Sequence, residues 1–234
     1  FAAIPQVVAI KVAPFHRYRT LDVVRGLIAA GAEDRIALYT GNDDHIVLDL
    51  LCPFTVRRGD EEVTLRIRGG LLGHWSVWTR NAVAYFDRIR QEVERGGGVD
   101  PALLALDSKV TDCNAALFDV AHGFAGCIAG CHEVLRRQGL LEGIWCLDPH
   151  EGLSPGQAEE IDRVYHDHPE LNDDAFVREV EEWLADARID IARAMKKLTP
   201  RQRRLCALLG EEGFSIKEAA ARLRIPRGTL YEEI

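Results

Sequence analysis

The first hundred residues alternate short apolar runs with longer helical patterns, and this alternation limits the fold more than any other feature of the chain. Two runs, 7–10 and 36–39, are continuously apolar, as strands buried on both faces are. A third strand, rich in glycine, is predicted at 69–73. Helical patterns follow these strands at 20–30, 46–51 and 79–94. Strands and helices alternating at these spacings indicate parallel βα units, and therefore the α/β class.

The other segments predict one hairpin and a series of helices. Residues 55–67 alternate around Arg58-Gly59-Asp60, which predicts a small β-hairpin inserted before the third unit. After Pro101 only helical periodicity remains, with Ser154 and Pro155 as the N-cap and first residue of one helix. The predicted helices cover 102–121, 124–138, 154–167, 173–185, 199–211, 215–223 and 226–234.

Charge divides the chain into two parts. The net charge of −8 comes from 29 basic and 37 acidic residues. Residues 187–234 hold eleven basic and six acidic residues, a net charge of +5, which leaves −13 for residues 1–186. We therefore expect two domains, 1–186 and 187–234. A cationic segment on an anionic body is typical of nucleic-acid contact, although a solvated basic helix face gives the same pattern.

Composition excludes several classes of protein. With 47% hydrophobic and 28% charged residues, the chain is of the globular and not the disordered type. No apolar run approaches the roughly 18 to 20 uncharged residues of a membrane span, and no secretory signal is present, so we expect a cytoplasmic protein without membrane contact. The six cysteines form no CxxC pair, which predicts reduced thiols.

The ends of the chain and of the predicted sheet indicate missing partners. The first residue is Phe1 and not methionine, and Ile234 falls within a helical pattern, so we expect the chain to be cut at both ends. Three βα units would leave bare outer strands, which proteins normally avoid. The parent protein is therefore expected to be a homo-oligomer, or to have further strands before Phe1.

Polar or glycine-rich residues follow all three predicted strands, at one edge of the sheet. Lys11 ends the first strand, at the edge where α/β proteins place their sites. Loss of hydration there would favour the neutral amine, which can attack a carbonyl carbon. The simpler alternative is that the Lys11 side chain reaches from the end of the strand into solvent. Gly41-Asn42-Asp43-Asp44 offers backbone amides and paired acids, or else forms only a turn that caps the next helix. The third segment contains Gly70, where a small residue lets a ligand approach the backbone.

These residues carry a resemblance to a known family. The Ile10-Lys11 strand end, the Gly41–Asp44 loop and the glycine-rich strand resemble strands six to eight of the dihydrodipicolinate synthase and N-acetylneuraminate lyase family. Later segments resemble its C-terminal helices: Cys113-Asn114-Ala115-Ala116-Leu117-Phe118 and Leu147-Asp148-Pro149. The resemblance implies about three βα units of a (β/α)8 TIM barrel with a helical tail. It also implies a class I lyase or aldolase without a cofactor, in which Lys11 forms a Schiff base with a 2-keto acid such as pyruvate and Gly41, Asn42, Asp43 and Asp44 lie at the substrate edge.

The chain departs from the family pattern in ways that affect activity. Val12-Ala13-Pro14 follows Lys11, where the family has an acidic and a small residue, and the Gly41–Asp44 loop carries an extra residue. The family's Thr-Thr or Ser-Thr turn and its proton-shuttling tyrosine belong to earlier strands, so we expect residues 1–186 to be inactive alone. Three histidines follow the strands and could converge on a metal, yet imine chemistry needs none and we expect no metal site: His16, His45 and His74.

The C-terminal segment resembles the helix-turn-helix of sigma-factor region four. Ser215 is predicted to cap one helix, with Glu218 completing a capping box, and Ala219 and Ala220 are small enough for close helix crossing. The resemblance implies a second helix in the DNA major groove, ending early at Ile234. The predicted DNA contacts are Arg201, Arg203, Arg222, Arg227, Thr229 and Tyr231. A three-helix packing module without DNA is the alternative.

These patterns indicate two functions. The first is a lyase fragment fused to a DNA-binding module. The alternative is a transcription regulator in which the barrel part senses a small keto acid or only holds subunits together.

Overall fold

The computed structural model describes residues 1–71, 73–208 and 216–223, which form a mixed α/β structure. Its sheet has four strands in the order β1-β2-β4-β3. Strands β1 (Ala9–Val12), β2 (Ala37–Thr40) and β4 (Glu61–Gly70) run parallel, and β3 (Pro53–Arg58) pairs antiparallel with β4. The predicted α/β class is confirmed, and the parallel strands end at one edge of the sheet.

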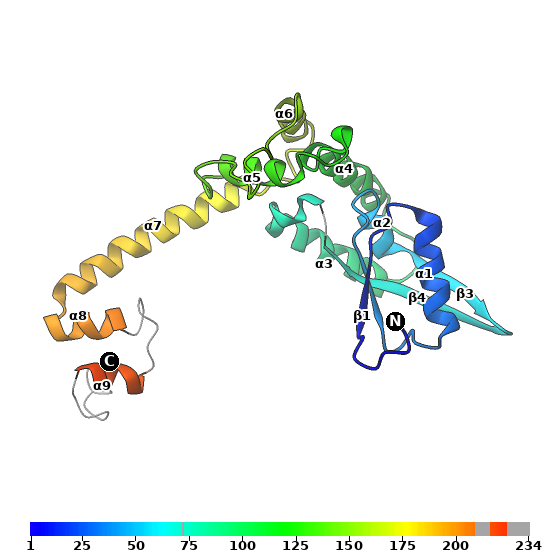
Figure 1. Ribbon diagram of the computed structural model, residues 1–234, viewed down its shortest axis with the longest axis horizontal. Helices are drawn as coiled ribbons and strands as arrows, with labels where there is room; N and C mark the ends of the chain where they lie inside the picture. The colour runs from blue at the N-terminus through cyan, green and yellow to red at the C-terminus, as the bar shows by residue number, and fades with distance from the viewer. Residues whose placement is uncertain (72, 209–215, 224–234) are drawn as a thin grey trace. The chain divides into compact units, whose positions relative to one another are not determined.

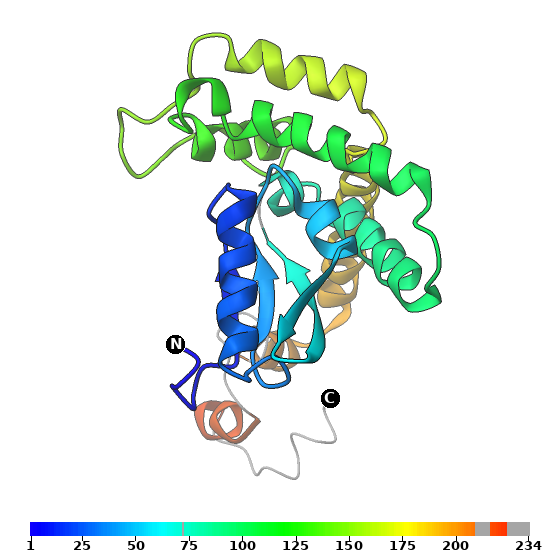
Figure 2. The ribbon, with the colours of Figure 1, turned by 90° about the vertical axis from the view of Figure 1, so that its right-hand side faces the viewer.

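Helices cover one face of the sheet in the described part of the chain. Alternate strand residues such as Val12, Leu38 and Leu65 are buried, whereas Lys11 and Tyr39 on the opposite face are exposed. Helices α1 (Arg17–Ala29) and α2 (Ile46–Leu51) supply apolar residues to the covered face: Val24, Leu27, Ile28, Ile46, Val47, Leu50 and Leu51. Figure 2 shows α1 lying along the sheet. The other face, called the open face below, is where Lys11 and Tyr39 project.

The predicted hairpin and the predicted third strand are one continuous element. Strand β4 pairs with β3 over residues 61–66 and with β2 over residues 67–70. The predicted hairpin is confirmed, but the expectation of a separate strand at 69–73 was wrong, because residues 69 and 70 are the end of β4. Between Ile67 and Gly69 the register with β2 shifts by one residue, so Arg68 is the extra residue of a β-bulge.

A group of helices follows the sheet. After the short helix η1 (Gly73–Ser76) come α3 (Thr79–Arg95), α4 (Pro101–Leu117), η2 (Val120–His122), α5 (Cys127–Arg137) and α6 (Gln157–Asp167). Asp100 caps α4 by accepting a hydrogen bond from the Ala102 amide at 2.9 Å. Ser154 does not cap α6, contrary to the prediction, because its hydroxyl donates to Asp119 and the helix begins three residues later.

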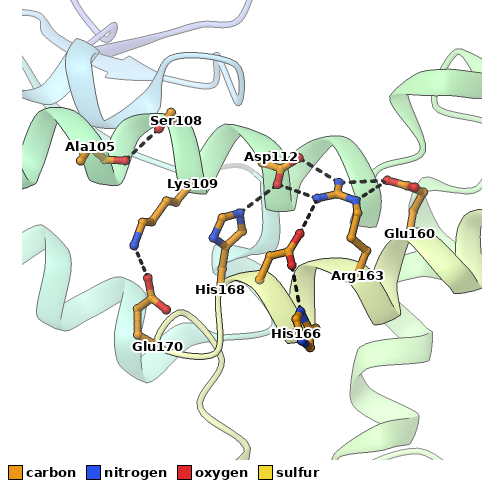
Figure 3. Close-up of polar contacts among 10 residues, drawn as sticks. Ala105, Ser108, Lys109, Asp112, Glu160, Arg163, His166, His168 and Glu170 are labelled. Carbon is orange, nitrogen blue, oxygen red and sulfur yellow. Dashed lines mark hydrogen bonds and ion pairs between the residues drawn. The ribbon is translucent and has the colours of Figure 1, made fainter.

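Polar side chains hold α4 against α6 and the segment after it, as Figure 3 shows. Asp112 of α4 accepts two hydrogen bonds from Arg163 of α6, at 2.8 and 2.9 Å, and lies 2.8 Å from His168 Nε2. These hydrogen bonds, above all those from Arg163, hold the pKa of Asp112 below its usual value. Lys109, one turn earlier, pairs with Glu170 at 2.6 Å.

The chain divides into two compact units, residues 1–177 and 178–234. Helix α7 (Asp174–Lys197) contains the boundary, and α8 (Pro200–Cys206) and α9 (Ile216–Leu223) follow it, labelled in Figure 1. Thr199 caps α8 in a capping box with Gln202. Ser215, the predicted cap of α9, and the predicted helix at 226–234 lie outside the described residues.

Candidate functional site at the carboxyl edge of the sheet

The structure brings Lys11 and Gly41 together. Lys11 projects from β1 on the open face, and Gly41 follows β2 with its amide donating to the Val12 carbonyl at 2.8 Å. A Cβ atom at Gly41 would lie 2.6 Å from Lys11 Cε and 3.5 Å from its Nζ, so the lysine side chain would have to move if a larger residue replaced this glycine. Within the described part of the chain the amine of Lys11 has no hydrogen bond or ion pair, and the residue is exposed. The described residues therefore do not provide the burial that the predicted loss of hydration requires.

Asn42 is buried and fixes the loop from within. Its Nδ2 donates to Asp49 Oδ2 at 3.0 Å and to Thr20 Oγ1 at 3.2 Å, and its Oδ1 accepts from the Phe15 amide at 3.1 Å. Asp49 is fully buried; it also accepts from Thr40 Oγ1 at 2.6 Å and pairs with Arg17. The side chain of Asn42 thus joins the ends of two strands to α1 and α2, and it is fully occupied by these contacts.

Asp43 is the buried carboxyl group of the loop. Its side chain is only 4% exposed, and its Oδ2 has no hydrogen-bond partner among the described residues. Burial, together with the charge of neighbouring Asp44, raises the pKa of Asp43 to about 6. Asp44 is exposed. Neither acid caps α2, contrary to the prediction, because the N-cap position is His45 and no side-chain cap bond forms.

The two glycines that end β4 face opposite sides of the sheet. A Cβ atom at Gly70 would lie 2.9 Å from Thr40 Cγ2 and 3.0 Å from Ile46 Cδ1, so Gly70 makes room for packing on the covered face. A Cβ atom at Gly69 would collide with the Tyr39 ring on the open face. The small size of Gly70 therefore serves packing on the covered face, and the small size of Gly69 makes room for the Tyr39 ring on the open face.

Asn114 of α4 connects the loop that follows β2 to the segment that follows β4. Asn114 was not predicted from the sequence as a site residue. Its Nδ2 donates to the Asp43 carbonyl at 2.7 Å, and its Oδ1 accepts from the His74 amide at 2.9 Å and lies 3.0 Å from His74 Nδ1. Helix α4 crosses this edge of the sheet (Figure 2). The only local signal for Asn114 was its position between Cys113 and the apolar run Ala115-Ala116-Leu117-Phe118.

The histidines that follow the strands do not converge. His74 is buried, and burial lowers its pKa to about 4, so its ring is neutral at pH 7. His45 instead lies 3.6 Å from Asp107, and His16 is exposed at the start of α1. Among the described residues, no group of three or more histidine, cysteine, aspartate or glutamate side chains is placed to hold a metal ion.

The predicted DNA contacts are only partly described. Arg203 on α8 and Arg222 on α9 are exposed. Arg201 is the second residue of α8, but its side chain is not described, and Arg227, Thr229 and Tyr231 lie outside the described residues. The structure therefore presents two of the six predicted side chains at a surface.

Comparison of the chain with protein-family models, with curated proteins and with solved structures finds no match. In the described part of the chain, no helix combines the length and the apolar character needed to cross a membrane.

Proposed function

We propose that the edge formed by Lys11 and the Gly41–Asp44 loop is an imine-forming site for a 2-oxo acid, within the end of a (β/α)8 barrel. The observation that supports this best is the position of Lys11 Nζ above Gly41, where parallel strands end and α/β proteins place their sites. In the described part of the chain helices cover one face of the sheet and the lysine lies on the other, which resembles barrel strands, whose outer face packs against helices and whose carboxyl ends carry the site.

The chemistry begins at the lysine amine. Neutral Nζ attacks C2 of the 2-oxo acid, the carbonyl oxygen takes up a proton, and loss of that oxygen as water leaves a C=N bond. A later carbon–carbon bond step needs an oxyanion site and a general acid or base. In the family that the sequence resembles, those groups come from earlier strands, so we expect the chain alone to form the imine without completing a lyase reaction.

Reductive trapping tests this proposal. Pyruvate and borohydride should convert the imine to a stable secondary amine, which peptide mass mapping locates on Lys11. Lys109, which pairs with Glu170, serves as the internal control and should remain unmodified. Modification spread evenly over the lysines, or none at Lys11, would contradict the proposal.

A second candidate function, a transcription regulator, is supported by the charge of the C-terminal segment. Residues 187–234 have a net charge of +5, and α8 and α9 carry exposed arginines. DNA affinity of the full chain should then fall steeply with salt, because each phosphate contact releases counterions. Arg203→Ala should weaken binding and flatten the salt dependence by about one unit, whereas Arg19→Ala, also exposed, should not. Binding that does not respond to salt would exclude this function.

A further inference from the structure

An open hollow of about 370 Å³ lies between α3 and the ends of β2 and β4. Its walls are mainly apolar, and Arg68 is the one cationic residue among those that line it. The larger side chains of the lining are Tyr39, Arg68, Leu71, Trp75, Val83 and Phe86. Val83 is 55% exposed and Leu71 is 56% exposed, although both are apolar. The volume falls in the range typical of small-molecule sites, in which apolar walls surround a few polar groups.

The β-bulge in β4 makes Arg68 project toward the face of the sheet on which the hollow lies. Because Arg68 is the extra residue in β4, it and Gly69 both face the open side, while Ile67 and Gly70 face the covered side. Arg68 is exposed, and its guanidinium forms no hydrogen bond or ion pair within the described part of the chain. An uncommitted guanidinium beside apolar walls matches a ligand that has an anionic group next to an apolar one.

The hollow lies one strand away from Lys11, which does not itself line it. Lys11 pairs in register with Tyr39, and Tyr39 pairs with Gly69, so the three positions form one row across the open face. Neighbouring strands of a sheet lie about 4.8 Å apart. Gly69 leaves space for the Tyr39 ring, which forms the wall between the lysine and the hollow.

We propose that this hollow binds small carboxylic acids with an apolar chain, with Arg68 contacting the carboxylate and Leu71, Val83 and Phe86 contacting the chain. That such an acid is also a 2-oxo acid captured by Lys11 rests on the proposed function; binding in the hollow does not. The proposal makes Arg68 and the apolar wall determinants of which acid the site accepts.

The experiment measures binding of acetate, butanoate and 4-methylpentanoate to the full chain by calorimetry. None of these acids has a ketone, so none forms an imine. Affinity should rise about fourfold for each added methylene that enters the hollow. Arg68→Ala should weaken 4-methylpentanoate about tenfold and leave the neutral 4-methylpentan-1-ol unchanged. Arg57→Ala, which removes another exposed arginine on the open face away from the hollow, is the matched control.

A second pair of variants tests the apolar wall without risk to folding. Val83→Asp places a negative charge in the hollow and should abolish measurable binding of the acid, whereas Val99→Asp, at an exposed position outside the hollow, should not. Equal affinity for acetate and 4-methylpentanoate, or equal effects of the paired variants, would overturn the proposal. Binding of 4-methylpentanoate without trapping of 2-oxo-4-methylpentanoate on Lys11 would refute the imine function alone.

Discussion

Asp49 is the residue on which the geometry of the edge depends most. Its fully buried carboxylate accepts hydrogen bonds from Thr40 and Asn42 and pairs with Arg17. Asp49→Ala leaves these donors without their acceptor, so we expect unfolding in urea to need about 3 kcal/mol less free energy. Asp22→Ala removes an exposed carboxylate paired only with exposed Arg25, and should change stability by less than about 0.5 kcal/mol. Equal midpoints for both variants would show that the buried carboxylate does not stabilise the edge.

Asp43 makes stability depend on pH. Because its folded pKa, about 6, exceeds the ordinary value of 3.8, the folded state binds the proton more tightly than the unfolded state does. The stability that the folded state gains by binding this proton is therefore fully present below about pH 4 and is lost as the pH rises through about 6. Asp43→Asn removes this titration, so the variant should exceed the natural chain by about 3 kcal/mol in urea unfolding at pH 8 and come close to it at pH 4. A difference independent of pH would contradict the assignment.

At the scale of the element, the bulge of β4 places both Arg68 and Gly69 on the open face of the sheet. Gly69→Ala would push a methyl group into the Tyr39 ring and should cost about 2 kcal/mol of stability. In a Tyr39→Ala background the same change should cost little, a coupling that a double-mutant cycle measures. Gly98→Ala, where the new carbon meets no atom within 4 Å, is the control. Additive effects of the two changes would show that the ring and the glycine do not touch.

Local pattern predicted the elements better than it predicted their partners. The alternation of Leu65, Arg66, Ile67 and Arg68 correctly indicates a strand. Nothing in this alternation shows that β4 pairs with β3 up to residue 66 and with β2 from residue 67 onward. The loop Gly41–Asp44 was likewise placed at the correct edge of the sheet. Its internal bonds were not predictable, because Asn42 and Asp49 find partners as far away as Phe15 and Arg17 in the sequence. Such contacts depend on tertiary packing that periodicity does not encode.

At the scale of the whole molecule, the structural boundary changes the charge argument. Division between residues 177 and 178 assigns Glu179, Glu181, Glu182 and Asp186 to the second unit. Residues 178–234 then hold twelve basic and ten acidic residues, a net charge of +2, against −10 for residues 1–177. The excess of positive charge is concentrated after residue 186, beyond the acidic first half of α7. The proposed contact with DNA therefore belongs to residues 187–234 and not to the whole second unit.

Two compact units imply two unfolding transitions. A unit of 57 residues buries a smaller share of its surface than one of 177, so residues 178–234 should unfold first. Far-ultraviolet circular dichroism should show both steps, because both units contain helices. Asp49→Ala lies in the larger unit and should lower the midpoint of the later transition only. If instead both steps move together in that variant, the units stabilise each other and the chain unfolds as one cooperative structure.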